Sequence, residues 1–468
     1  MRLYLIFIAI GLLSLASSCS KFLEESSQSE VVPRTAESLN EYLLGDAYPQ
    51  LYSNSFYPEE SYLHDDIEMN AYRAKDVLTF IYTWQPDMDK VTLGGSTPWQ
   101  SIYTAIQACN TTLDYLPKVT GKQAFKNYVG GQAQLLRAFL YFKLVNLYAL
   151  PYNDRQSDPK TNLAVPLLLT GGVELSRKPR NTVAELYTQI EKDLKEGIAL
   201  IEGSGQVHNK FRMGSNAGHL LASRVYLSME KWAEVIKHTD VLVGGTYKLM
   251  DLRNWGPPDA QLNPVISAGN PETIWAFSAY NDVSVSDTIA FKASADLRQR
   301  YVAGDLRNGI YLANGVYKKV FNPGNNPAQA FRVSEAYLNR AEAFAQLYKS
   351  GTSNAGQQCI NLLNALREKR FSSDKYVPWT LQALDKDLLQ YVRAERRREL
   401  YGEGHRWFDL RRYGMPRIEH RFFSSETQVN KYVLEERDPG YVLPIPRTAI
   451  ALNPNLIQNP LAPIRQPK

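Results

Sequence analysis

The sequence predicts a mainly α protein, built as a tetratricopeptide-like helical repeat scaffold with long irregular loops and a few short strands on one side. Apolar residues recur at helical spacing in several long segments. Alanines occupy close-contact positions in consecutive pairs of these segments, which is typical of helical repeats. Two stretches, 41–96 and 244–330, are rich in Gly, Pro, Asn, Asp and aromatic residues and interrupt the helical pattern. A generic helical bundle is the alternative fold.

The first half of the chain contains three clear helix signals. Thr97 is placed to cap a helix that has Pro98 at its first position and runs to Pro117. Residues 122–149 are so densely apolar that we expect a helix buried around most of its circumference. Residues 182–185 form a capping box that opens a third helix.

The second half contains helix pairs and short strands. We expect Cys109 and Cys359 to be buried thiols in helices, because two distant cysteines do not make a disulfide framework. The alternation in residues 271–278 predicts a strand. The remaining predicted elements are helix pairs at 216–229 with 231–243 and at 331–349 with 354–370, a helix at 385–401, and a strand at 316–320.

The N-terminus predicts export and lipidation. Arg2 precedes a short apolar run, and small residues follow it up to Cys19. The run is too short to span a bilayer, so residues 1–18 are interpreted as a cleaved signal peptide. The cysteine after the small residues resembles the lipobox of bacterial lipoproteins, in which the thiol is acylated. Residues 19–40 then form a lipidated tether; an ordinary secreted protein is the alternative.

Composition excludes some classes of function. The net charge of +5 is small for 468 residues, and the basic residues are dispersed apart from a run near the C-terminus, which argues against a nucleic-acid partner. No later segment is apolar enough to span a membrane. His64, Asp65 and Asp66 are too few to predict a metal site, and no cofactor motif is present.

The irregular regions carry the candidate ligand contacts. Many of the 29 tyrosines and 7 tryptophans lie outside the helical segments, where rings could stack on a sugar face. We expect the two regions to meet over the helical scaffold as a shallow platform. Acidic and Arg side chains there could bind vicinal hydroxyls. The candidate residues are Asp65, Asp66, Arg73, Trp84, Trp275 and Tyr280.

Residues 393–414 carry a long and specific motif. Glu395 with Arg398, and Arg396 with Glu399, are i,i+3 neighbours, and two glycines end the helix. The run resembles the C-terminal signature of the SusD/RagB family, where the motif is structural and not catalytic. The matching residues are Glu395, Arg396, Glu399, Glu403, Arg406, Trp407, Asp409 and Arg412.

The resemblance covers nearly the whole mature chain. It implies one SusD-like domain over residues 41–468, with the helical scaffold at about 97–243 and 331–414 and a C-terminal wrapping tail at 415–468. The irregular regions 41–96 and 244–330 then form the ligand-binding side.

The same resemblance implies a function. It implies an outer-membrane lipoprotein that faces the cell exterior, binds oligosaccharides without catalysis or cofactor, and serves a SusC-like TonB-dependent transporter. One alternative is a surface glycoside hydrolase, which needs two facing carboxylates such as Asp65, Asp66 or Glu68. The other is a peptide-binding or protein-interaction scaffold.

Overall fold

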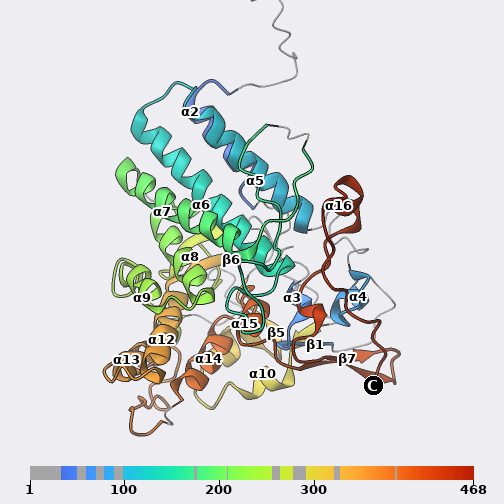
Figure 1. Cartoon of the computed structure of the whole chain (residues 1–468). Coiled ribbons are helices and arrows are strands. Elements are labelled where there is room, and N and C mark those ends of the chain that lie inside the picture. Colours follow the sequence, from blue (N-terminus) through green and yellow to red (C-terminus); the bar gives the residue numbers. More distant parts are fainter. Residues whose placement is uncertain are drawn as a thin grey trace, which may run out of the picture.

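The computed structural model confirms a mainly α protein with few and short strands (Figure 1). The predicted signal peptide (1–18), Cys19, Arg73 and Tyr280 lie outside the described residues. The structure describes residues 33–49, 60–69, 78–88, 98–172, 176–207, 209–255, 264–277, 291–320, 327–384 and 387–468.

The first group of helices is α2 (Ala36–Asp46), α5 (Pro98–Tyr115), α6 (Gln123–Tyr148) and α7 (Val183–Ser204). The three helices expected here from the sequence are confirmed. Helix α2 begins before residue 40, where the sequence places the end of the tether. Thr35 and Ser38 cap each other's backbone amides, and Leu39 and Leu43 are buried, so folded structure starts at this cap.

Helices α6 and α7 pack closely because glycines lie at their contact. A Cβ atom on Gly131 would lie 2.6 Å from the Ile201 side chain and 2.8 Å from the Gly197 carbonyl oxygen. The capping box at the start of α7 is present: the Thr182 hydroxyl accepts from the Glu185 amide, and Glu185 accepts from the Thr182 amide. These glycines therefore set the distance between α6 and α7.

The second group of helices contains the two predicted pairs. Alanines lie buried inside them, including Ala222 on the first pair and Ala341 on the second. Cys109 and Cys359 are buried free thiols on α5 and α13, as expected, and burial raises the pKa of each to about 12. The group comprises α8 (Ser215–Ser228), α9 (Trp232–Asp240), α12 (Val333–Lys349), α13 (Ala355–Glu368), α14 (Leu388–Glu399) and α15 (Arg406–Arg412).

The strands form four antiparallel pairs among the described residues. The strand expected at 271–278 is confirmed as β2, whereas the one expected at 316–320 ends at Tyr317. Hairpin β7–β8 lies in the segment interpreted as a tail. The pairs are β1 (Ile67–Met69) with β3 (Phe291–Ala293), β2 (Thr273–Phe277) with β6 (Gln329–Arg332), β4 (Leu312–Ala313) with β5 (Val316–Tyr317), and β7 (Ile418–Phe423) with β8 (Val429–Leu434).

Short helical elements connect these parts. They are α3 (Glu60–Leu63), α4 (Leu78–Tyr82), α10 (Ala295–Gln299), α11 (Arg307–Ile310), α16 (Arg447–Leu452), and the 3-10 turns Leu252–Asn254 and Pro439–Tyr441.

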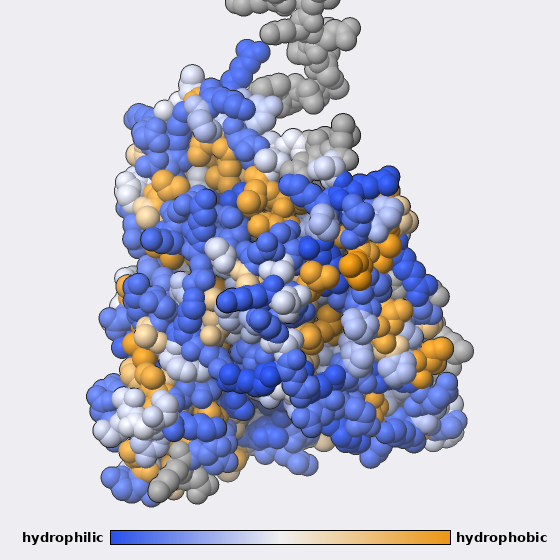
Figure 2. Space-filling view, viewed as in Figure 1, coloured by the Kyte–Doolittle hydropathy of each residue, from blue (hydrophilic) through white to orange (hydrophobic). Residues whose placement is uncertain are grey.

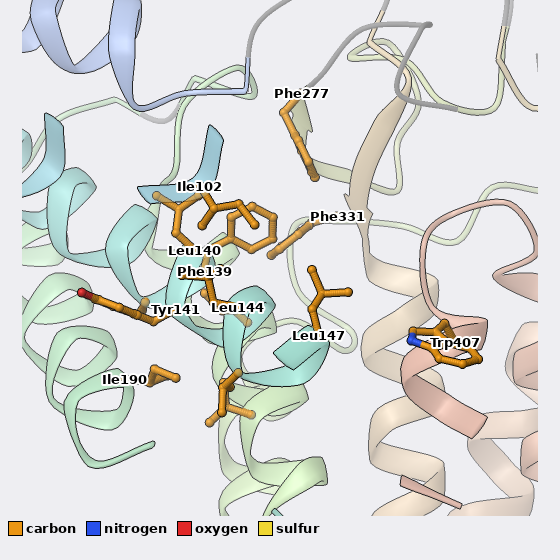
Figure 3. Packing of buried hydrophobic residues seen from close by; sticks show 14 of the residues in the cluster. Ile102, Phe139, Leu140, Tyr141, Leu144, Leu147, Ile190, Phe277, Phe331 and Trp407 are labelled. Carbon is orange, nitrogen blue, oxygen red and sulfur yellow. The ribbon is translucent and has the colours of Figure 1, made fainter. Parts of the chain in front are cut away.

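An aromatic cluster joins the helices to the strands. Phe139 of α6 lies edge-on to Trp275 of β2 and to Phe331 of β6, with ring centres 5.6 and 6.0 Å apart. Figure 3 shows Phe139 between the helical layer and Phe331. Edge-to-face pairs of this kind add to the hydrophobic gain of burial.

The C-terminal segment crosses both halves of the molecule. The Leu443 amide donates to the Leu147 carbonyl at the end of α6, over 2.9 Å. Arg465 Nε donates to the Trp84 carbonyl over 3.0 Å. Residues 435–468 therefore bridge the helical layer and the segment that follows α4 (Figure 1).

Candidate functional site

The two irregular regions meet at the β1–β3 pair. Met69 is paired with Phe291, and the rings of Tyr62 and Tyr82 both lie edge-on to Phe291, with ring centres 5.1 Å apart in each case. Met69 directly precedes residues 70–77 in sequence, and Phe291 directly follows residues 278–290. The structure thus joins the two regions, as expected from the sequence, at the ends of the segments that contain Arg73 and Tyr280.

Trp84 is not a surface ring, contrary to the prediction. Its side chain is fully buried and stacks on His420, with ring centres 4.0 Å apart. Its Nε1 donates to the Leu63 carbonyl over 2.9 Å. The indole is therefore held in the core, and a sugar in solution has no access to its face.

Trp275 is equally inaccessible. It stacks on Phe277, with ring centres 4.0 Å apart, and four aromatic rings surround it. Its position in β2, a strand buried along its whole length, explains this. The prediction that Trp84 and Trp275 stack on a ligand is wrong in this structure, because each packs against residues far away in sequence.

Asp65 and Asp66 are occupied by arginines of the C-terminal motif. Arg406 binds Asp65 through two hydrogen bonds of 2.7 and 2.8 Å, and Arg397 contacts both acids. Burial alone would raise the pKa of Asp65, but Arg406 and Arg397 outweigh it and hold that pKa well below its usual range. The prediction that these acids face a ligand is therefore replaced by an ion-pair role.

The neighbouring histidine is also engaged. His64 is buried, and its Nδ1 accepts from the Asp66 amide over 3.1 Å. Within the described ranges, no cluster of three or more His, Cys, Asp or Glu is arranged to hold a metal ion. The same part of the chain contains no helix long and apolar enough to cross a bilayer.

Glu399 is the centre of a buried ion-pair network. Its carboxylate accepts from Arg370 over 2.8 Å, from Arg332 over 3.1 Å and from Arg307 over 3.2 Å. The Tyr311 hydroxyl adds a hydrogen bond of 3.0 Å. All these side chains are fully buried, and the arginines keep the pKa of Glu399 well below its usual range despite burial.

The pairing inside α14 differs in part from the prediction. Glu395 contacts Arg398, as the i,i+3 spacing predicts, and also accepts from Arg307 over 2.7 Å. Arg396 does not pair with Glu399; it donates to Asp409 of α15 over 2.8 Å. Glu399 is already surrounded by three arginines from other elements, so Arg396 is left to bind the next helix.

The loop after α14 extends the network. Glu403 accepts from Lys319 over 2.6 Å and from Arg332 over 2.6 and 2.9 Å. Burial lowers the pKa of Lys319 to about 8 against the attraction of Glu403. Trp407 is fully buried and stacks on Tyr441, with ring centres 4.9 Å apart. The motif thus binds α14, α15 and the C-terminal segment into one unit.

Several members of this network carry no sequence signal of their own. None of them belongs to a recognisable motif: Arg332, for example, stands between Phe331 and Val333, and nothing in the local sequence reveals its partner. The unpredicted members are Glu272, Asp305, Arg307, Lys319, Arg332 and Arg370.

A small cavity lies behind this network. Its volume is about 60 Å³, and Phe139, Gln329 and Arg224 are among the residues that line it. The Arg224 guanidinium lies 3.8 Å from the centre of the Phe331 ring. Since a buried water needs roughly 10–15 Å³ of such space, the cavity has room for a few waters and not for an oligosaccharide.

The sequence matches two models of one family. Residues 21–227 match a SusD-like family described as starch-binding and associating with the outer membrane, and residues 306–461 match the SusD family. Together with the motif on α14 and α15, these matches show that the chain belongs to the SusD/RagB family.

Named relatives agree with this assignment. The chain is 22% identical over 553 aligned positions to SusD-like protein P25 of Formosa agariphila, which covers 98% of each chain. It is 21% identical to SusD-like protein P38 of the same organism, covering 87% of this chain and 90% of that protein.

Solved structures share the fold. A putative sugar binding protein from Bacteroides vulgatus superposes with a TM-score of 0.72 at 24% identity, covering 92% of this chain and 99% of that one. A SusD superfamily protein from Bacteroides thetaiotaomicron gives a TM-score of 0.72 at 20% identity, covering 91% and 100%. At this level of identity the likeness concerns the fold.

Proposed function

We propose that the chain is a non-catalytic glycan-binding lipoprotein of the outer membrane, which captures oligosaccharides and delivers them to a SusC-like TonB-dependent transporter. The family match carries this proposal, because one of its models is described as starch-binding and associating with the outer membrane. The pairing of β1 with β3 supports this proposal, because it brings the two irregular regions together and residues from both could then contact one ligand.

The ligand contacts are proposed to come from the segments that flank this sheet. Arg73 belongs to the segment that follows Met69, and Tyr280 to the segment that precedes Phe291. A guanidinium donates several hydrogen bonds to vicinal hydroxyls, and a tyrosine ring stacks on a sugar face while its hydroxyl bonds the edge. We expect micromolar to millimolar affinity, which suits a protein that releases its cargo.

The decisive experiment is a glycan-binding screen with the soluble form that starts at Ser20. We expect Arg73→Ala and Tyr280→Ala to weaken retention of the bound glycan. Tyr280→Phe keeps the ring and removes the hydroxyl, so it measures the contribution of the hydroxyl alone. Arg253→Ala is the matched control, because Arg253 pairs chiefly with the nearby Asp251. Unchanged affinity in both Ala variants would contradict this placement of the site.

The lack of catalysis is tested in the same preparations. Incubation with each bound glycan should release no new reducing ends, because the paired acids available near the sheet, Asp65 and Asp66, are bound by arginines. Release of reducing ends by the pure protein, and not by a mock preparation, would establish the hydrolase alternative.

The anchor is tested by Cys19→Ser. We expect this variant to leave the membrane fraction, because acylation requires the thiol, and to capture less of the transporter on detergent extraction. Attachment raises the local concentration of the binding protein at the membrane, so the interface itself need not be tight. A Cys19→Ser protein that stays in the outer-membrane fraction would contradict lipidation there.

A further inference from the structure

Arg393 differs from the other arginines of α14. Arg396 pairs with Asp409, Arg397 with Asp66, and Arg398 with Glu395. In the described part of the chain, Arg393 has no carboxylate partner, and its buried Nε has no hydrogen-bond acceptor. A half-buried guanidinium without a counter-ion is unusual in a chain that pairs its other arginines on this helix.

Arg393 is also held in place. Its guanidinium lies over the Tyr413 ring, 3.9 Å from the ring centre, and Arg412 approaches the same ring at 4.4 Å. Arg412 is bound in turn to Glu342 and Asp409. Arg393 therefore stacks on a ring that is itself fixed, and less side-chain freedom is lost when it binds a ligand.

The guanidinium lines a surface depression between α9, α12 and α14, which are neighbours in Figure 1. Its volume is about 650 Å³, which is within the range of roughly 300–1,000 Å³ that ligand sites occupy. Trp232, the first residue of α9, supplies a half-buried ring, and Gln346 and Lys349 of α12 supply polar groups.

Among the described residues that line the depression, the basic side chains outnumber the acidic ones. The two described acids are engaged: Glu230 is bound by Arg155 and Asn153, and Asp387 caps the start of α14 by accepting from the Leu389 amide over 3.2 Å. Lys349 is exposed and, among the described residues, has no carboxylate partner.

We propose that this depression binds the sulfate or carboxylate group of an acidic saccharide, with Arg393 and Lys349 on the anion and Trp232 against the sugar ring. The guanidinium of Arg offers paired donors that match a carboxylate or sulfate. The proposal rests on the proposed glycan-binding function and adds a second site, on the helical side, that selects for negative charge.

The test uses the soluble form and isothermal titration at low salt. The ligands are glucuronic acid and methyl glucoside 6-sulfate, with methyl glucoside as the neutral reference and inorganic sulfate as the bare anion. The variants are Arg393→Gln, Arg393→Lys and Lys349→Gln. Lys122→Gln is the charge-matched control, because Lys122 is exposed next to the start of α6, outside the depression.

We expect the acidic sugars to bind more tightly than methyl glucoside, with affinity falling as salt is raised. Arg393→Gln should weaken the binding of the acidic sugars by at least about tenfold, and Lys349→Gln should weaken it by less. Lys122→Gln should leave it unchanged. Arg393→Lys keeps the charge but loses the paired donors of the guanidinium, so this variant should still bind the acidic sugars more weakly than the unchanged protein. If Arg393→Gln melts early, Arg393→Lys and Lys349→Gln carry the test.

Equal affinity for acidic and neutral sugars would overturn the proposal, and so would equal affinity in Arg393→Gln and the Lys122→Gln control. Binding of an aspartate-rich peptide that depends on Arg393, without saccharide binding there, would also overturn it by assigning the site to a protein. Neutral glycan binding that depends on Arg73 or Tyr280 would then leave the proposed function standing. Saccharide binding at neither site would reject both.

Discussion

Asp65 and Arg406, which lie 341 positions apart, form a bidentate ion pair. Nε of Arg406 donates to Oδ1 of Asp65 over 2.7 Å, and Nη2 donates to Oδ2 over 2.8 Å. This contact fastens the first irregular region to the C-terminal motif. The turn that precedes β1 is thereby held against the start of α15. The motif therefore supports the first irregular region through defined contacts and not only by closing its own helix.

Loss of this pair should destabilise the fold. Asp65→Asn leaves Arg406 and Arg397 without part of their counter-charge. Because the Asp65 side chain is 22% exposed, we expect the free energy of unfolding to fall by about 2 kcal/mol, which is less than for a fully buried pair. Asp240→Asn is the control, since Asp240 forms a surface pair and is 70% exposed. Urea unfolding checks this; equal midpoints for the two variants would disprove it.

Gly402 should tolerate no side chain. Its φ is 75°, and an added Cβ would lie 2.3 Å from the Tyr317 ring. Gly414 has φ 99° but open space around it. Gly414→Ala should therefore lose only about 1–2 kcal/mol of stability, the cost of placing a residue with a Cβ in a left-handed backbone conformation. Gly402→Ala should lose more, because the Tyr317 ring must also move. Thermal melting of both variants measures the difference, and a Gly402→Ala protein as stable as Gly414→Ala would refute the clash.

The two buried tryptophans should act on stability and not on ligand contact. Trp84→Ala and Trp275→Ala each empty a fully buried site, so we expect losses of about 3–5 kcal/mol. Phe80→Ala, close to Trp84 in sequence but 44% exposed, should change stability little. Denaturant midpoints test stability, and affinity at low temperature tests binding. Weaker glycan binding by a Trp variant of undiminished stability would restore these rings as ligand contacts.

His420 predicts a loss of stability in mild acid. Burial lowers its pKa to about 4, although its ring nitrogens lie 2.7 Å from the Tyr82 carbonyl oxygen and 2.9 Å from that of His64. The His420 ring binds a proton near pH 6.5 in the unfolded chain, but only near pH 4 in the folded chain. Stability from this group is therefore present above pH 6.5 and is lost as the pH falls toward 4.

Nuclear magnetic resonance titration of the histidine ring signals measures this directly, with His420→Asn to assign the resonance. The ring should remain neutral at pH 5.5 in the folded protein. A midpoint near 6.5 for the His420 signal would show that the two carbonyl oxygens offset the effect of burial, and it would remove the predicted acid sensitivity.

Local signals were enough to predict much of the scaffold. The capping box of Thr182 and Glu185 and the apolar spacing of residues 122–149 describe interactions within one helix, and both helices are present. The pairing of Arg396 was predicted wrongly because i,i+3 spacing permits a contact but does not rank it against Asp409 on another helix. The two tryptophans were predicted wrongly because Gly- and Pro-rich surroundings suggest a loop, while burial depends on distant partners.

The sequence by itself determined the family, the helical character and the motif that closes the C-terminal part, because these depend on residues close together in the chain. Only the tertiary structure decided which arginines surround Glu399, since they come from positions 29, 67 and 92 residues away. It also decided that Asp65 serves the motif and that Arg393 has no carboxylate partner among the residues the structure describes. Charges are paired through space at distances of a few ångströms, and spacing along the chain does not record those distances.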